Sequence, residues 1–304
     1  MIFKINIFFY FIFSFSVLYA NWNDNVFSNM SSPRNIALGS IHLSSNSLSS
    51  IFDAPINIFD IDKKYYNKSF YFCLSTQSQN ISNTIYFSSA LYIAKDYNLY
   101  FGLVRRLINN NYNTENAWID NGNDIPDNGE IDYNNIYSYR DSEIGILLSY
   151  NKKIGDNIIG FNIKPIFHKI DYNNAFGIAF DLNYVKFINN NQIGLGIKDL
   201  LSMKKWNDGI YEKYNSNFYI NYTFFGKGIL YSFEYDNYLK FKYGIEYTVN
   251  DILSLRLGSN NSKLSIGIGV KTDLFNIDYS YINNTSDFGD FNQLGISLKI
   301  EEFK

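Results

Sequence analysis

The chain has 304 residues, a formal net charge of -3, a single cysteine, two histidines and 19% aromatic residues. Its near-neutral charge argues against a nucleic-acid-binding protein and against a basic membrane-surface protein. Cys73 alone excludes a disulfide framework and cysteine-based zinc sites, and two histidines argue against a histidine metal cluster.

The first twenty residues, MIFKINIFFYFIFSFSVLYA, have the layout of a secretory signal peptide. One basic residue, Lys4, precedes an apolar run, and the small residue Ala20 precedes a polar segment. The apolar run is shorter than the ~20 residues that a membrane-spanning helix needs. We therefore expect residues 1–20 to be a signal peptide that is cleaved near Ala20, and the mature chain to be exported.

A segment rich in small residues follows the leader. Within it, SSPRNIALGSIHLSSNSLSSIFDAPINIF combines Ser, Asn and Gly with apolar residues such as Leu38 and Ile41. Small residues allow close backbone approach, and the apolar positions are typical of a packed segment. The alternative is an ordinary first strand that follows a long periplasmic leader.

From Ser69 onward the hydrophobic pattern has a period of two, which predicts half-buried strands. In ILYSFEYD, for example, Ile229, Tyr231 and Phe233 share one face, while Glu234 lies on the other. The predicted strands are 68–76, 83–94, 97–106, 142–151, 157–169, 174–187, 191–199, 215–225, 228–235, 239–248, 252–259, 262–270, 273–282 and 290–300.

Two architectures fit amphipathic strands: a soluble sandwich and a transmembrane barrel. The polar faces carry Gly, Ser, Asn and isolated charges, which suit a crowded lumen better than a solvated surface. The strand number is even, and the long connections 107–141, 200–214 and 283–289 all fall on one side. We therefore predict an all-β protein, an antiparallel 14-stranded transmembrane β-barrel at 67–304, located in a bacterial outer membrane and in contact with its lipid.

Strand parity places a ladder of charges in the predicted lumen. Its members are Glu234, Lys240, Lys242, Glu246 and Arg256. A three-residue turn would set Glu234 opposite Lys240, with Lys242 diagonal to it, and Glu246 would lie opposite or diagonal to Arg256. The lumen is strongly favoured for these charges, because a Lys or Arg at mid-depth on the lipid face costs about 2 to 4 kcal/mol.

Two loops carry candidate sites. Asp120, Asp124, Asp127 and Glu130 stand among Asn and Gly in the predicted extracellular loop 107–141. Carboxylates spaced in this way suggest a solvated acidic loop, and the alternative is a calcium site, although the EF-hand pattern is not met.

The second candidate is the apolar, basic loop tip in which LGIKDLLSMKKW ends, and it is predicted to form one helical turn. Leu201, Met203 and Trp206 would anchor it, or alternatively would contact a partner protein. Neither His42 nor His168 has a paired nucleophile, so we expect no enzyme and no other cofactor.

Two stretches carry a family resemblance. Arg34, Leu38 and Gly39 in SSPRNIALGS resemble the N-terminal strip of the PorV/PorQ and FadL-like outer-membrane proteins, although DAPIN departs from the usual Asn-Pro-Ala-Gly turn. The C-terminal stretch YGIEYTVNDILSLRLG and its continuation GIGVKTDLFNIDYSY resemble the last strands of the PorV group.

The resemblance implies that residues 21–66 form a hatch, with Arg34, Leu38, Gly39 and Ile41 packed in or under the barrel. By resemblance to PorV, the protein would be a non-enzymatic component of type IX protein secretion or cell-surface attachment, with secretion-machinery or exported proteins as partners. By resemblance to FadL, it would transport small hydrophobic molecules. A purely structural barrel is the third alternative.

Overall fold

A computed structural model describes residues 20–22, 25–28, 31–43, 48–55, 69–77, 82–93, 97–122, 127–238, 240–261, 263–283 and 290–299. Apart from Ala20, the predicted signal peptide lies outside these residues. No helix among them is long and apolar enough to span a membrane.

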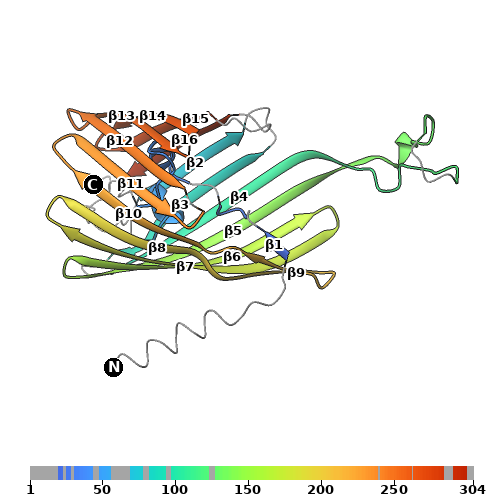
Figure 1. The fold of residues 1–304 in the computed structure, drawn as a ribbon, viewed down its shortest axis with the longest axis horizontal. Helices are drawn as coiled ribbons and strands as arrows, with labels where there is room; N and C mark the ends of the chain where they lie inside the picture. Colours follow the sequence, from blue (N-terminus) through green and yellow to red (C-terminus); the bar gives the residue numbers. More distant parts are fainter. Residues whose placement is uncertain are drawn as a thin grey trace, which may run out of the picture.

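Fourteen antiparallel strands close into a barrel within the described residues, which confirms the predicted fold class (Figure 1). Each strand pairs with the next one along the barrel, β8 pairs with β10, and β16 pairs with β2 to close the ring. The strands are β2 Ser69–Gln77, β3 Asn83–Ile93, β4 Tyr97–Asn113, β5 Tyr137–Ile154, β6 Asn157–Ile170, β7 Asn173–Ile188, β8 Asn191–Trp206, β10 Asn217–Phe225, β11 Ile229–Asp236, β12 Phe241–Val249, β13 Leu253–Asn260, β14 Lys263–Lys271, β15 Phe275–Ile282 and β16 Phe291–Lys299.

The barrel has an apolar outer surface and a polar interior. On β12, Tyr243 is 53% exposed and points outward, whereas the adjacent Lys242 is 5% exposed and points into the lumen. Because successive strand residues face opposite sides, the same alternation runs along the other strands. The strands are thus built to face an apolar medium outside and a packed, polar lumen inside.

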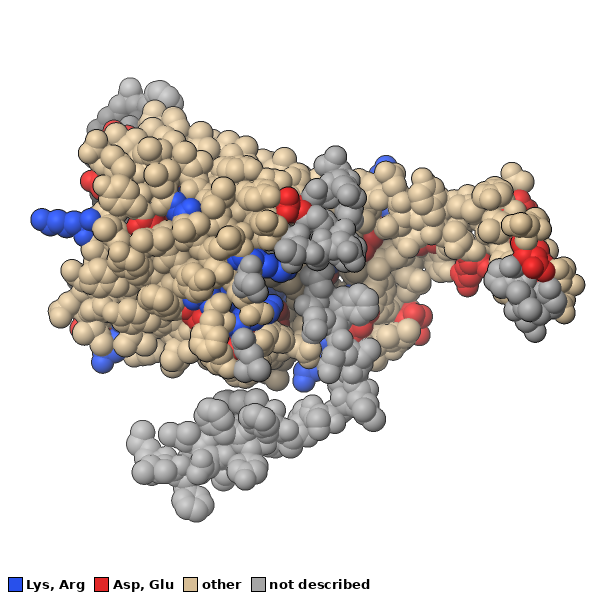
Figure 2. Space-filling view, turned by 45° about the horizontal axis from the view of Figure 1, so that its top comes forward, with Lys and Arg blue, Asp and Glu red and all other residues tan. Residues whose placement is uncertain are grey.

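The connection between β4 and β5 is shorter than predicted, because both strands extend beyond the barrel as a paired hairpin. Residues 107–113 and 137–141 belong to these strands and form ladder pairs across a β-bulge near Asn110. The sequence INNNYN lacks the apolar alternation that marks a strand, but backbone pairing needs no apolar side chains. We call residues 107–141 the finger; it projects from one end of the barrel, and acidic residues gather on it (Figures 1 and 2).

The predicted loop 200–214 is also largely strand. β8 continues to Trp206, and the short strand β9, Tyr211–Tyr214, folds back against it. A further short strand, β1 (Ala20–Trp22), pairs with β9 in parallel. The expected helical turn around Leu201, Met203 and Trp206 is therefore wrong, because β8 extends through two bulges to reach them.

Parts of the N-terminal segment lie buried within the barrel. Helix α2 (Pro33–Ala37) begins at Ser32, whose side chain accepts a hydrogen bond from the Asn35 amide, and Pro33 stands at its first turn. The 3-10 helix η1 is formed by Leu48–Phe52. Residues 44–47 and 56–66 lie outside the described residues, so a hatch over the whole of 21–66 stays a prediction.

The finger gives a test of orientation. In outer-membrane barrels the long connections face outward and the short turns face the periplasm. Proteinase K added to intact cells should therefore cut between residues 114 and 136 and should leave the turn at 272–274 intact. Mass spectrometry of the released peptides reads the result, and cleavage at the turn with an uncut finger would reverse the orientation.

Candidate functional site

A strip of glycines on the lumen wall receives the chain that follows α2. Gly244 and Gly258 lie opposite each other on β12 and β13, and Gly267 lies on β14. A methyl group at any of these positions would overlap the backbone or side chain of residues 37–39. Gly39 itself has a φ of 84°, a conformation that favours glycine. The N-terminal segment therefore packs backbone to backbone against the wall.

Hydrogen bonds fix this contact. The Ser265 hydroxyl on β14 donates to the Ala37 carbonyl at 3.1 Å and accepts the Gly39 amide at 3.1 Å. Leu38 and Ile36 are buried on either side of this contact. The buried backbone groups at the end of α2 are thus paired with the barrel, as buried polar groups must be.

A chain of alternating charges ties α2 to three strands. Arg34 donates from Nε and Nη2 to the Glu246 carboxylate at 2.7 and 2.5 Å. Arg256 donates to the same carboxylate at 2.5 Å and to Asp278 at 2.6 Å. Glu246 and Arg256 are directly opposite in the β12–β13 pair. Each buried charge has an opposite partner, without which burial would cost several kcal/mol.

The second part of the predicted ladder has a different register from the expected one. Glu234 lies opposite Lys242, at 2.8 Å, and not opposite Lys240. Lys240 lies in the turn between β11 and β12, which is longer than the predicted three residues because β12 begins only at Phe241. A longer turn moves the pairing by one inward position.

His42 joins the N-terminal segment to this pair. Its backbone amide donates to Glu234 at 2.8 Å, and its Nδ1 lies 2.6 Å from the same carboxylate. The imidazole also stacks on Tyr219 of β10, with ring centroids 4.2 Å apart. Burial lowers the pKa of His42 to about 4, against the favourable charge of Glu234, so the ring is neutral at neutral pH.

Asp53 holds two described pieces of the N-terminal segment together. Its carboxylate accepts the amides of Ser31 and Ser32 and the side-chain amide of Asn35. Burial raises the pKa of Asp53 to about 6 in spite of these donors and of the nearby Lys198. We call the described residues 25–28, 31–43 and 48–55 the plug, since they are buried against the lumen wall and against one another.

Two bulges in β8 bring consecutive charged residues into the lumen. The pairing with β7 shifts by one residue between Leu182 and Phe180 and again between Phe180 and Ile178. Asp199 has a φ of 56°, and both Lys198 and Asp199 are buried. A bulge aims side chains that strict alternation would point apart, and bulges recur near functional sites.

Both inward residues have partners. Lys198 donates to the Phe27 carbonyl at 3.1 Å, which anchors the start of the plug. Asp199 accepts from Lys164 at 2.6 Å, and Lys164 also pairs with Asp181 at 2.6 Å. This network could not be predicted from period-two patterning, because the bulge breaks the period at the residues that form it.

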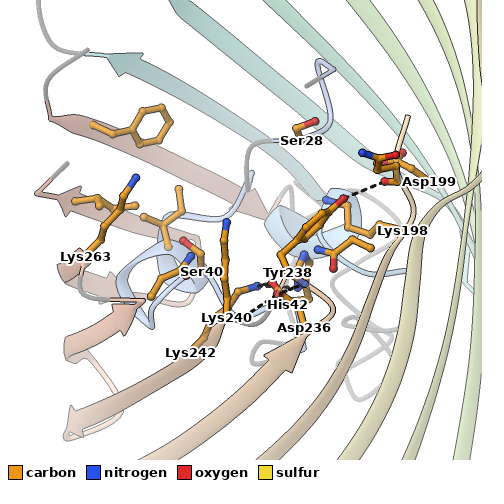
Figure 3. Close-up of a pocket in the computed structure, with 16 residues that line it drawn as sticks. Ser28, Ser40, His42, Lys198, Asp199, Asp236, Tyr238, Lys240, Lys242 and Lys263 are labelled. Carbon is orange, nitrogen blue, oxygen red and sulfur yellow. Dashed lines mark hydrogen bonds and ion pairs between the residues drawn. The ribbon is translucent and has the colours of Figure 1, made fainter. Parts of the chain in front are cut away.

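An outer vestibule is lined by residues of the plug and of the barrel wall (Figure 3). The connections that border it, β8–β10, β11–β12, β13–β14 and β15–β16, are on the same end of the barrel as the finger. Its volume is about 410 Å³. Its four lysines outnumber its two carboxylates, so the lining carries excess positive charge. It is lined by Ser28, Ile36, Ser40, His42, Lys198, Asp199, Asn215, Asn217, Asp236, Tyr238, Lys240, Lys242, Asn260, Lys263, Ile282 and Phe291.

A second cavity, the wall pocket, lies across the barrel wall from the vestibule. It has a volume of about 530 Å³ and a nearly wholly apolar lining. Outward residues of four strands form its sides: Leu182, Tyr184, Leu195, Ile197, Phe218, Ile220 and Tyr235, with Asn237 of the next turn. Asn183, Gly196 and Tyr219 form its floor, and Gly196 has no side chain there, since a Cβ would overlap the Tyr219 ring.

The residues of the two predicted loop sites lie in different surroundings. Leu201 and Met203 are exposed on β8, while Trp206 donates from its indole to Glu212 at 2.7 Å. In the finger, Glu130 accepts hydrogen bonds from the Trp118 indole and from the amides of Asn121 and Asp127.

The predicted calcium site stays an expectation. Asp124 lies outside the described residues, while Asp120 and Asp127 lie within them. Among the described residues, no group of three or more Asp, Glu, His or Cys is arranged to hold a metal ion. The Glu130 carboxylate instead accepts three hydrogen bonds that link residues of the finger tip.

The fold is similar to that of several solved transporter structures. No family model matches the sequence, and no curated protein matches it. Among solved structures, it is similar to the Pseudomonas putida toluene transporter TodX, with a TM-score of 0.60, 8% identity, and coverage of 92% of this chain and 98% of that one. It is also similar to the Ralstonia pickettii toluene transporter TbuX, with a TM-score of 0.59, 10% identity, and coverage of 90% and 100%.

A Pseudomonas aeruginosa FadL homologue has a TM-score of 0.50 and 10% identity, with coverage of 90% of this chain and 98% of that one. Identities this low establish the fold alone. The chain therefore shares the barrel fold of these structures, and none of these comparisons shows membership of the PorV/PorQ family.

The glycine strip predicts how the plug can be dislodged. Gly258→Val places a branched side chain where the backbone of Leu38 and Gly39 lies, and overpacking of this kind costs about 1 to 3 kcal/mol. Conductance in planar bilayers should rise, because the displaced plug opens the lumen. Gly226→Val, at a turn with more room on the end of the barrel opposite the finger, is the control. An unchanged conductance in a Gly258→Val barrel that is folded by gel mobility would contradict the packing.

Acid acts on two plug residues in opposite directions. Docking favours neutral His42, so it weakens as pH falls from 6.5 towards about 4. Docking also favours protonated Asp53, so it strengthens as pH falls from about 6 towards 3.8. Bilayer current should therefore rise on acidification in Asp53→Asn and fall in His42→Gln. The same response in both variants would contradict the assignment.

Proposed function

We propose that this chain is a non-enzymatic channel of the bacterial outer membrane that passes small hydrophobic molecules between the outer vestibule and the wall pocket. One observation carries the proposal: two cavities lie on opposite faces of the wall, and only the sheet at Gly196 and a pair of stacked rings separates them. His42 lines the vestibule, and Tyr219 lines the wall pocket.

The stacked rings are suited to act as a gate. The Tyr219 hydroxyl hydrogen-bonds to the Asn183 side chain, and its ring rests on Gly196 and on His42. Gly196 adds no side chain to the lumen face of the wall, so the Tyr219 ring covers the sheet there; movement of this ring together with local opening of the β8–β10 ladder would join the cavities. Transfer of an apolar molecule from the charged vestibule to an apolar pocket lowers its free energy by about 25 cal/mol per Å² of apolar surface removed from water.

The comparisons support this choice of substrate class. Structures of similar fold are described as toluene transporters and as a monoaromatic hydrocarbon channel. The wall pocket, at about 530 Å³, is within the range of small-molecule sites and is lined by apolar and aromatic side chains. The outward apolar belt supports placement in a membrane, and the predicted signal peptide supports export to the outer one.

The PorV/PorQ alternative is a role in type IX secretion with protein partners. It rests on the sequence pattern of the C-terminal strands. Its expected partner surface was a loop carrying Leu201, Met203 and Trp206. These residues lie instead on β8, where Leu201 and Met203 face outward. No contact among the described residues favours this alternative over transport.

Tyr219→Ala tests the gate. It removes one ring stack and one hydrogen bond, together about 1 to 2 kcal/mol. Uptake of toluene by cells expressing the variant should rise roughly 5- to 30-fold. Tyr222→Ala is the matched control, because Tyr222 lies on the same strand and faces outward but does not line the wall pocket.

Equal uptake in Tyr219→Ala, Tyr222→Ala and the unaltered chain would remove the transport proposal. If deletion of residues 207–210 then left surface proteins unattached, with the barrel assembled, the secretion alternative would replace it.

A further inference from the structure

Three cations gather on the outer surface of the barrel at the base of the finger. Arg105 lies on β4, Arg140 on β5 and Lys169 on β6, and all three are exposed. Strand parity points them outward, since the adjacent residues Arg106, Asp141 and His168 face the lumen. We call Arg105, Arg140 and Lys169 the basic patch.

The strand register brings these side chains together. Lys169 pairs with Ser142, which pairs on its other side with Leu107, two residues beyond Arg105. The three cations line one shallow cavity of about 410 Å³, together with Leu107, Ser138, Tyr139, Ser142 and Asp171. Long cationic side chains on three adjacent strands thus surround a single space.

The patch is not neutralised by the protein. Within the part of the chain that the structure describes, no ion pair involves Arg105, Arg140 or Lys169. The one carboxylate in the cavity, Asp171, accepts hydrogen bonds from the Tyr137 hydroxyl at 2.6 Å and from Asn113 at 3.4 Å. The cavity therefore keeps an excess of positive charge.

A row of apolar side chains crosses the sheet at the level of Arg105, and Lys169 and Arg140 lie beyond this row toward the finger. Arg105 pairs with Ile85 on one side and Ile144 on the other, and both isoleucines are exposed. Phe167 and Phe176 form a contacting ring pair in the next positions and are also exposed. Apolar side chains in this row face acyl chains, so Lys169 and Arg140, which lie beyond the row, stand nearer the lipid headgroups. The long Arg105 side chain can extend from the row toward the same level.

We propose that the basic patch binds the phosphate of an anionic membrane lipid whose acyl chains lie along Ile85, Ile144, Phe167 and Phe176. Arginine suits this role, because its planar guanidinium forms paired hydrogen bonds to phosphate. The proposal rests on the membrane placement given above but not on transport. Lipid binding here would hold the base of the finger in a fixed orientation at the membrane surface.

The test uses the folded full chain in an uncharged detergent and titrates it by calorimetry with dioctanoyl phosphatidic acid. Each cation near a lipid surface contributes about fivefold in affinity, so the triple variant R105Q/R140Q/K169Q should bind about 100-fold more weakly. Lys152→Gln with Lys186→Gln is the matched control, because these exposed lysines lie at the opposite end of the barrel.

Two probes separate the sources of binding. Dioctanoylglycerol has the same chains without phosphate, and inorganic phosphate has no chains; both should bind far more weakly than phosphatidic acid. Equal binding of either probe, or an equal loss in the control variant, would overturn the proposal. Should the triple variant fail to show folded gel mobility, Lys169→Gln alone must still weaken binding about fivefold.

Discussion

A closed barrel of fourteen strands encloses a lumen wider than its own side chains can fill, and the rest of the structure follows from this constraint. Small barrels fill their interior from the wall. Here the plug supplies the missing volume, and the glycine strip at Gly244, Gly258 and Gly267 lets its backbone approach the wall closely. Small residues in the N-terminal segment and glycines on the strands that it contacts together allow the two backbones to pack closely.

Filling a polar lumen requires that every buried charge have a partner. The ion-pair chain of Arg34, Glu246, Arg256 and Asp278 runs from the plug along the lumen face of the wall. Glu234 pairs with both Lys242 and His42. Such pairs add modest net stability but penalise every misplaced arrangement, because a lone buried charge is costly. The ion pairs therefore specify where the plug lies, while the glycines permit it to lie there.

The sequence predicts what depends on local periodicity and misses what depends on register. The fourteen strands follow from alternation, and charge parity points Glu246 and Arg256 to the lumen, where they meet. The bulge at Asp199 breaks the period and turns Lys198 and Asp199 inward together, which no alternation predicts. The wall pocket depends on the alignment of Gly196 with Tyr219 across two strands, and such alignments appear only once the pairing is known.

The plug docked on the glycine strip is the central claim, and amide hydrogen exchange tests it most directly. In the structure, the amides of Ile36, Leu38, Gly39 and Ser40 are hydrogen-bonded within buried turns. Exchange read by mass spectrometry on the folded barrel should show peptides covering 31–43 protected for as long as the barrel strands, since opening requires undocking. Exchange of these peptides at the rate of a free chain, with the strands still protected, would contradict the account.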